Sequence, residues 1–184
     1  MRIIGGEFRS RTLIAPKGND TRPTLDQVRE SLFNILQFRI ENARVLDLFA
    51  GSGALALEAL SRGAQSAVLC DISPDACKAI ARNIGSLGCL ERARLMRMPA
   101  ERALETLRQE KARFELIFLD PPYRMDASEL IDRLMDAGLL ADEGQIIVEH
   151  DQKTPPQPGE KAVLTDRRTY RGTCLSFYGR NSNV

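Results

Sequence analysis

The sequence predicts an α/β fold built on a parallel β-sheet. From Arg44 onward, short apolar runs rich in branched residues alternate with longer amphipathic stretches, the pattern of repeated strand–helix units. The chain has 184 residues, 43% hydrophobic and 28% charged, which is typical of a globular domain with its own core. We expect one domain over 1–184, with an N-terminal extension over 1–40, a strand–helix core over 44–150 and a C-terminal antiparallel hairpin over 161–180.

The N-terminal extension is predicted to be a small hairpin followed by a helix. Two short segments, 2–4 and 11–14, flank a pair of glycines that permits a tight turn. Thr24 with Gln27 three residues later fits a capping box, and an apolar stripe then continues the helix to about Phe38.

Five core strands are expected, each short and apolar enough to be buried on both faces. They are Val45–Phe49, Ser66–Asp71, Ala93–Met98, Phe114–Leu119 and Gln145–Glu149. The intervening helices are expected at about 53–62, 74–87, 100–111 and 128–137. Ser73 as N-cap and Pro74 at the first helical position open the second of these helices.

The C-terminal part is predicted to add an antiparallel hairpin to the sheet. Residues 151–160 contain three prolines and a glycine, so they form a loop rather than a helix or a central strand. Ala162–Thr165 and Thr173–Tyr178 then form two strands joined at the turn-like Arg171-Gly172.

Charge is unevenly distributed along the chain. The net charge is +1, but residues 1–24 carry +3 and residues 161–184 carry +4, which leaves −6 for the middle. Two cationic ends around an acidic body are compatible with a polyanion docking on one face. The arginines that could contact phosphates are Arg9, Arg11, Arg22, Arg29, Arg167, Arg168 and Arg171.

The four cysteines and the start of the chain indicate the cellular compartment. No Cys-x-x-Cys pair or zinc-ligand spacing occurs, so we expect reduced thiols and no metal. Neither a signal peptide nor an apolar stretch long enough to span a membrane is present. The sequence therefore predicts a cytoplasmic protein without a membrane partner.

A glycine turn after the first core strand predicts a nucleotide-type cofactor site. Gly51 and Gly53 can adopt positive φ and let the backbone approach a ligand, and the next helix begins there. Asp71 ends the second strand 20 residues after Gly51, where a carboxylate can bind ribose hydroxyls. Because Gly51-x-Gly53-x-x-Ala56 also satisfies the dinucleotide fingerprint, a nicotinamide-dependent oxidoreductase stays open.

The tetrapeptide Asp120-Pro121-Pro122-Tyr123 follows the fourth core strand, at the same edge of the sheet. The two prolines remove N–H donors, so the segment offers acceptors beside the Asp120 carboxylate. An exocyclic base amine has two N–H bonds to donate, and Tyr123 supplies a ring on which a base can stack. The tetrapeptide therefore indicates an amine-binding site.

Together these motifs resemble the S-adenosylmethionine-dependent amino-methyltransferases of nucleic acids. With residues 2–6, 22–24, 28–34 and 46–64, the chain resembles the RsmD-type 16S ribosomal RNA guanine-N2 methyltransferases. The resemblance implies a Rossmann-like, seven-stranded class I methyltransferase fold and methylation of one guanine N2 in small-subunit RNA. The implied partner is 16S rRNA, within a small subunit or an assembly intermediate, and the protein is expected to be a monomer.

The resemblance also implies roles for individual residues. Catalysis and base binding fall to Asp120, Pro121, Pro122 and Tyr123. The residues implied for S-adenosylmethionine are Asp47, Phe49, Gly51, Ser52, Gly53, Asp71, Ile72 and Ala100. Those implied for RNA are Arg9, Arg11, Arg22, Thr24 and Arg29.

Two further alternatives stay open beside the oxidoreductase. A DNA adenine-N6 methyltransferase shares the Asp-Pro-Pro-Tyr chemistry, although 184 residues leave little room for a separate target-recognition region. An RNA-binding module without catalysis would bind RNA and transfer no methyl group.

Overall fold

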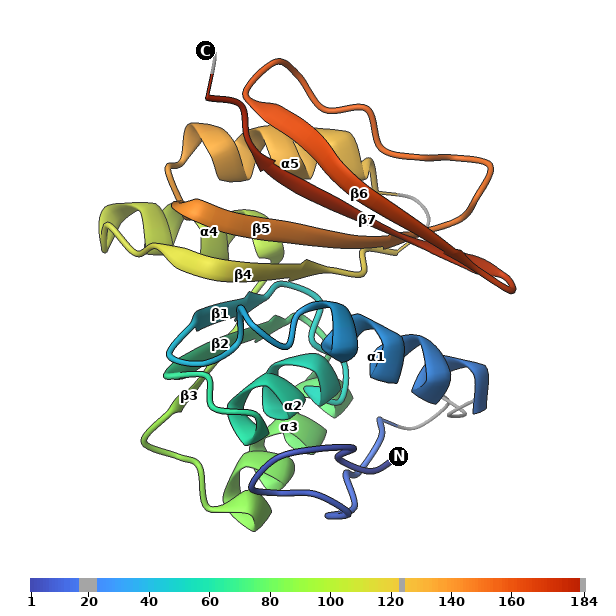
Figure 1. Ribbon diagram of the computed structural model, residues 1–184. Helices are drawn as coiled ribbons and strands as arrows, with labels where there is room; N and C mark the ends of the chain where they lie inside the picture. The colour runs from blue at the N-terminus through green and yellow to red at the C-terminus, as the bar shows by residue number, and fades with distance from the viewer. Residues whose placement is uncertain (17–22, 123–124, 183–184) are drawn as a thin grey trace.

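The computed structural model describes residues 1–16, 23–122 and 125–182, and it shows a sheet between two helical layers (Figure 1). The sheet has seven strands in the order β3-β2-β1-β4-β5-β7-β6. Their bounds are β1 Arg44–Asp47, β2 Ser66–Asp71, β3 Ala93–Arg97, β4 Phe114–Leu119, β5 Leu140–His150, β6 Ala162–Tyr170 and β7 Thr173–Arg180. The predicted α/β class and seven-stranded sheet are confirmed.

The first five strands are parallel and the last two form an antiparallel hairpin beside β5, as predicted. Asp47 at the end of β1 pairs with Leu69 of β2 and Phe118 of β4, and Leu119 of β4 pairs with Val148 of β5. The carboxyl ends of four strands therefore meet at one edge, where open α/β sheets bind ligands.

Among the described residues, five helices cover the two faces of the sheet. They are α1 Pro23–Ile35, α2 Ala54–Ser61, α3 Pro74–Leu87, α4 Ala100–Gln109 and α5 Ala127–Asp136. One core cluster joins α1, α2 and α3 to side chains such as Val45, and the other joins α4 and α5 to side chains such as Leu46. Neighbouring residues of β1 thus enter opposite cores, as expected of a strand buried on both faces.

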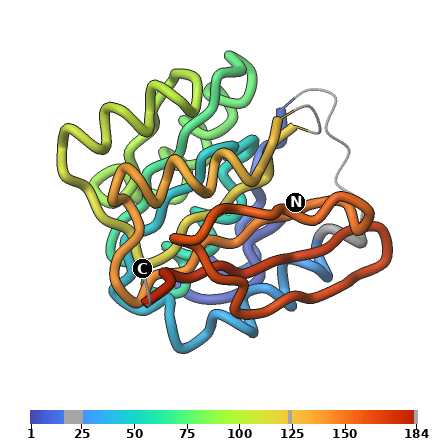
Figure 2. Tube along the Cα trace, turned by 90° about the horizontal axis from the view of Figure 1, so that it is seen from above, coloured from blue at the N-terminus to red at the C-terminus, as the bar shows by residue number. Residues whose placement is uncertain are grey.

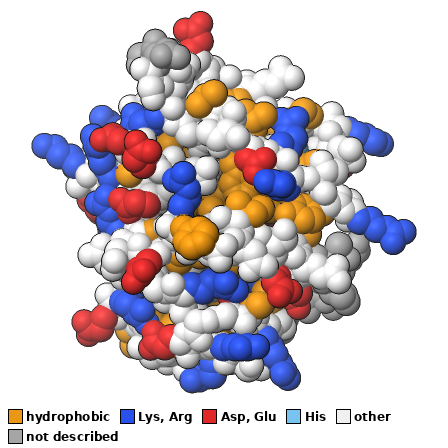
Figure 3. All heavy atoms as spheres, viewed as in Figure 1, with side chains coloured by type: hydrophobic (Ala, Val, Ile, Leu, Met, Phe, Trp, Pro, Cys, Tyr) orange, Lys and Arg blue, Asp and Glu red, His pale blue; other side chains and the backbone are white. Residues whose placement is uncertain are grey.

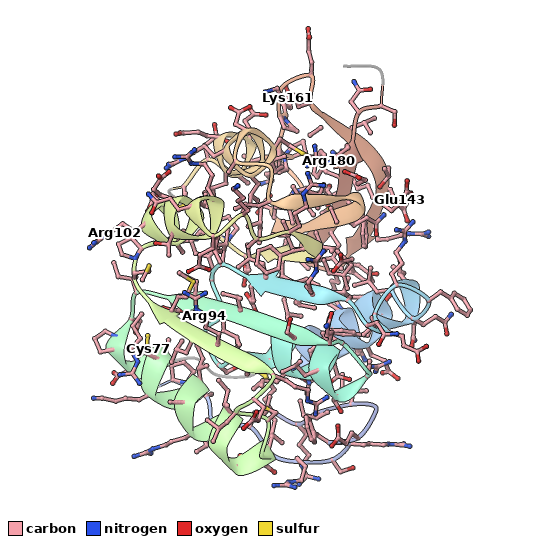
Figure 4. All side chains as sticks on the ribbon, turned by 90° about the vertical axis from the view of Figure 1, so that its left-hand side faces the viewer. Cys77, Arg94, Arg102, Glu143, Lys161 and Arg180 are labelled. Carbon is pink, nitrogen blue, oxygen red and sulfur yellow. The ribbon has the colours of Figure 1, made fainter. Side chains whose placement is uncertain are left out.

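The C-terminal hairpin lies at the far end of the sheet from α3 (Figure 2). Arg180 at the end of β7 donates to the Leu140 carbonyl at 2.6 Å, and Lys161 pairs with Asp136 of α5 at 2.6 Å. Both side chains reach from the hairpin region toward the rest of the chain (Figure 4). These contacts fix the hairpin against β5 and α5.

Several predicted boundaries were wrong. Helix α1 begins at Pro23, so Thr24 is its second residue and not the N-cap of a capping box. It ends at Ile35, and Phe38 beyond it is 91% exposed, whereas Leu36 and Ile40 on either side of it are buried. Strand β5 begins at Leu140, ahead of the predicted Gln145, because a register shift in its pairing with β4 lets a polar, exposed stretch join the strand.

The N-terminal segment forms the predicted small hairpin, with one antiparallel bridge, Arg2 with Thr12, and backbone hydrogen bonds from the Ile3 N–H to Arg11 and from the Leu13 N–H to Met1. It runs beneath α2 and α3 (Figure 1) and is bound there by Glu58, a fully buried carboxylate. Glu58 accepts the N–H groups of Ile4 at 2.7 Å and Gly5 at 2.8 Å, and the Nε of Arg62 at 2.7 Å. Main-chain donors thus satisfy a buried charge and hold the segment in place.

Within the residues that the structure describes, no helix combines the length and the apolar character needed to cross a membrane.

Candidate functional site

A cleft of about 1070 Å³ opens at the carboxyl edge of the sheet. Its walls come from the segments after β1, β2, β3, β4 and β5, from α1 and α5, and from the turn between β6 and β7. The lining residues of interest are Val28, Phe49, Gly51, Asp71, Ile72, Met98, Ala100, Asp120, Pro121, Pro122, Asp126, Glu149, His150, Asp151, Arg171 and Thr173. The two motifs singled out from the sequence therefore share one cavity.

The glycine turn forms as predicted, with its two glycines doing different work. Gly51 has φ 55° and lines the cleft, and a Cβ placed on it would meet no atom within 4 Å. Gly53 has φ 80° and is the N-cap of α2, where a Cβ would lie 2.9 Å from Leu69. Gly51 thus leaves room for a ligand, whereas Gly53 lets α2 pack against β2.

Asp71 connects the glycine turn to the helix after β2. Its Oδ2 accepts the Gly51 N–H at 2.9 Å and its Oδ1 accepts the Ser73 N–H at 2.8 Å. Ser73 is the N-cap of α3 as predicted, with Pro74 opening the helix. Each oxygen of Asp71 keeps a second lone pair, so the carboxylate can be fixed by the backbone and still accept from a ligand.

Asp47, Ser52 and Gly53 lie behind the cleft wall and do not line it. Asp47 is 2% exposed, and the backbone N–H groups of Ala56 and Phe49 hydrogen-bond its carboxylate. Burial, and secondarily the charge of Asp120, raise the pKa of Asp47 to about 7. Asp47 therefore shapes the turn from within rather than presenting its carboxylate to the cavity.

Asp120 faces the cleft at the end of β4, with Pro121 and Pro122 beside it. Its surface is open to water in the cleft, but the surrounding walls restrict how much water can solvate it. This desolvation, and then the charge of Glu149, raise the pKa of Asp120 to about 7. Arg22 and Tyr123, also predicted for the site, lie outside the described residues.

Glu149 and Thr173 are site residues that sequence reasoning missed. Glu149 follows Val148 on β5 as Asp120 follows Leu119 on β4, and the Thr173 hydroxyl donates to its Oε1 at 3.1 Å. Burial raises the pKa of Glu149. A signal was present, since Glu149 also ends a parallel strand, but it carries no recognisable motif.

His150 lines the cleft without a catalytic partner. Its Nε2 lies 2.8 Å from Ser176 Oγ and its Nδ1 lies 2.7 Å from the Asp151 carbonyl. Arg167 Nε donates to the same Ser176 oxygen at 3.0 Å. These bonds give His150 a hydrogen-bonded structural role.

The cleft is acidic, and the described arginines among those predicted to bind RNA differ in their surroundings. Arg171 lines it, and Arg9 is exposed. Arg29 is 6% exposed and bound to the Arg2 carbonyl and Asp26, so the structure does not support a phosphate contact for it.

Cations and anions are interspersed on the face in Figure 3, without a single basic area. Arg11 donates to Ser86, and Arg168 pairs with Asp166.

A methyl donor with a nucleoside and a positively charged sulfur fits the cavity chemically. The space at Gly51 accommodates a ligand against the backbone, and the exposed side chain of Ile72 offers an apolar surface beside Asp71. The acidic lining residues Asp71, Asp120, Asp126, Glu149 and Asp151 outnumber the one arginine found among the described lining residues. A negative, partly desolvated cleft favours a cationic ligand.

Comparisons with known proteins agree on one family. The family model described as "Conserved hypothetical protein 95" matches residues 1–179. A Bacillus subtilis protein named "Putative rRNA methyltransferase YlbH" is 38% identical over 180 residues, which cover 97% of this chain and 98% of the relative.

Two Escherichia coli comparisons point the same way. The protein of strain K12 named "Ribosomal RNA small subunit methyltransferase D" is 42% identical over 152 residues, covering 82% of this chain and 75% of the relative. The solved structure of yhhF superimposes with a TM-score of 0.86 at 38% identity, covering 99% of this chain and 98% of that chain.

Proposed function

This chain belongs to the family described as Conserved hypothetical protein 95, and from that membership we infer that it is an S-adenosylmethionine-dependent methyltransferase of small-subunit ribosomal RNA. The RsmD-type resemblance found in the sequence motifs is confirmed by the relatives, and the Rossmann-like class I methyltransferase fold by the superposition. The observation that carries the proposal is one cleft holding both the Gly51–Asp71 turn and Asp120.

The cofactor end is formed by the turn after β1 and the end of β2. Gly51 and Asp71 would hold the nucleoside part, with Phe49, Ile72 and Ala100 as apolar walls. Asp47, Ser52 and Gly53 would support this end from behind. When bound, S-adenosylmethionine supplies a methyl group on a positively charged sulfur.

The target end orients the amine that is to be methylated. Asp120 would accept one N–H of the exocyclic amine, and the donor-free segment Pro121-Pro122 adds only acceptors. An aromatic amine is a poor nucleophile because its lone pair is delocalised into the ring. Acceptors that hold its N–H bonds favour the pyramidal nitrogen needed for attack, and alignment contributes most of the rate.

Asp120 can also receive the proton that the methylated amine must release. A pKa of about 7 matches a proton acceptor that works near neutral pH. The Asp120 carboxylate thus holds the N–H bond first and then takes the proton at one of its oxygens. Tyr123 would stack on the extruded base, which must leave its own stack to enter the cleft.

The substrate proposal follows the names of the relatives and the base chemistry of the motif. We propose the exocyclic N2 of one guanine in 16S rRNA, presented by a small subunit or an assembly intermediate, and a monomeric, cytoplasmic enzyme. The exposed Arg9, and Arg171 in the lining of the cleft, would contact RNA phosphates. An oxidoreductase would leave Asp120 after β4 and Glu149 near the end of β5 without a role.

The test is transfer of labelled methyl from S-adenosylmethionine to small subunits, free 16S rRNA and duplex DNA, taken from cells that lack this protein. We expect label in RNA alone, recovered as N2-methylguanosine after digestion. Label in DNA or in methyladenosine would overturn the proposed substrate. Cofactor binding without any methyl transfer would overturn the proposed enzymatic activity.

A further inference from the structure

We propose that Glu149 is the specificity-determining residue of the target end, a second acceptor that selects guanine through its N1–H. This inference rests on the proposed function and deepens it. It assigns the choice of base to a side chain that is outside the Asp120–Tyr123 motif.

The sheet register places Glu149 beside Asp120. Leu119 of β4 pairs with Val148 of β5 in a parallel ladder, so the next residue on each strand lies at the same level. Both carboxylates line the cleft. The charge of Glu149 also raises the pKa of Asp120, in agreement with this placement.

Thr173 holds one oxygen of Glu149 and leaves the other available. The Thr173 hydroxyl donates to Oε1 at 3.1 Å from the start of β7. Within the described residues, Glu149 has no cationic partner, and its Oε2 accepts no hydrogen bond. A partly buried carboxylate in a cleft, held at one oxygen, is arranged to accept a donor from a ligand.

Guanine is the amine-bearing base that matches two neighbouring acceptors. Its N1–H and its N2 amine are adjacent donors on one edge, so Asp120 can accept from N2 while Glu149 accepts from N1. In adenine and cytosine the ring nitrogen beside the exocyclic amine is an acceptor. Its lone pair would face the Glu149 carboxylate, and a site built for a donor rejects such a base strongly.

The experiment compares guanine with 2-aminopurine at the methylated position. 2-Aminopurine keeps the 2-amine but has an acceptor at N1, so it removes only the proposed Glu149 contact and the O6 group. Reconstituted small subunits carrying either base are methylated by wild type, E149Q and T173V. S-adenosylmethionine binding, measured by calorimetry, verifies that each variant is folded.

In wild type, we expect kcat/KM for 2-aminopurine to be about 10- to 100-fold below that for guanine. E149Q should lose activity mainly on guanine and narrow this ratio at least about tenfold, because the amide can pair with an N1 acceptor. T173V should narrow the ratio of guanine to 2-aminopurine less than E149Q does, because it removes only the hydrogen bond that holds Glu149 in place.

An unchanged guanine to 2-aminopurine ratio in E149Q would overturn the inference, since a merely structural role lowers both rates together. If E149Q fails to bind the cofactor, an unchanged ratio in T173V overturns it in the same way. Absence of guanine methylation by the wild type would instead refute the proposed function.

Discussion

The carboxylates at the two ends of the cleft differ in how far the protein's own hydrogen-bond donors satisfy them. At the cofactor end, both oxygens of Asp71 accept backbone N–H groups, from Gly51 and Ser73. At the target end, Asp120 and Glu149 stand side by side, no backbone N–H of the described residues donates to either carboxylate, and both have raised pKa values. One end is already satisfied by the fold, whereas the other is left for a ligand to satisfy.

This difference separates recognition from chemistry. A carboxylate fixed by main-chain donors keeps its position, which suits a cofactor that binds in the same way at every turnover. A pair of desolvated carboxylates disfavours its own charge until donors arrive, which suits an amine that must be held and then deprotonated. Changes at the two ends should therefore affect different measurements.

The largest expected effect comes from Asp120→Ala. Removing the acceptor at the target amine should lower the single-turnover rate of methyl transfer by about 10²- to 10⁴-fold. Asp120→Asn keeps one oxygen acceptor but takes no proton, so it should retain part of the activity. Equal rates for wild type and Asp120→Ala on small subunits would show that the acceptor is elsewhere.

A smaller effect is expected from Asp71→Ala at the cofactor end. Losing a charged acceptor for ribose hydroxyls and the Gly51 clamp should weaken S-adenosylmethionine binding by about 10- to 100-fold. Asp71→Asn is the matched control, because its one carbonyl oxygen can keep a single backbone bond. The KM for the cofactor reports the change, and the rate at saturating cofactor should fall far less than in Asp120→Ala.

The pH dependence of transfer should follow Asp120. Because its pKa is raised to about 7, the accepting carboxylate form is lost as pH falls through 7. The value of kcat/KM should then decline toward about tenfold per pH unit below pH 6 and reach a plateau near pH 8. E149Q should move the midpoint to lower pH, since it removes the neighbouring charge. A profile that is flat between pH 5.5 and 8 would contradict this assignment.

Asp47, which lies behind the cleft, should make the free energy of unfolding depend on pH. Its folded pKa of about 7 lies above the ordinary value of 3.8. Between these pH values the unfolded chain releases a proton that the folded chain keeps, so the free energy of unfolding falls as pH rises. The loss, up to about 4 kcal/mol, is complete above pH 7.

Asp47→Asn should remove this dependence and make the cofactor-free protein more stable than wild type at pH 8, with little difference at pH 4. Urea unfolding at pH 4, 6 and 8 measures it. If the free energy of unfolding depends on pH in the same way in both proteins, Asp47 is ionised in the folded state. Its hydrogen bonds with the N–H groups of Phe49 and Ala56 would then stabilise the charge more than burial destabilises it.

Much of the fold could be predicted from the sequence because the parallel strands carry their own signal. Ser66–Asp71 and Phe114–Leu119 match the predicted strands at both ends, and Pro74–Leu87 matches the predicted helix. Local chemistry sets these boundaries: apolar runs that can be buried on both faces, and a serine–proline helix start. The first part of strand β5 was missed because Asp142 and Glu143 are polar and exposed, and this part joins the sheet through an irregular pairing with β4.

The cleft residues that belong to a sequence motif could be predicted, whereas those brought to the cleft by strand pairing alone could not. Gly51, Asp71 and Asp120 were found because their residue types and spacing suggest ligands. Glu149 depends on the register between β4 and β5, which no local pattern reveals. Arg29 was predicted to bind RNA, but its side chain is buried and donates to the Arg2 carbonyl, a tertiary contact that no local pattern reveals.

The most direct test of the division between the two ends is calorimetric titration of S-adenosylmethionine into wild type, Asp71→Ala and Asp120→Ala. We expect wild type and Asp120→Ala to bind within a few-fold of each other, and Asp71→Ala to bind at least about tenfold more weakly. If Asp120→Ala weakens binding as much as Asp71→Ala, or if wild type does not bind the cofactor, the two carboxylates do not serve separate ligands and the account fails.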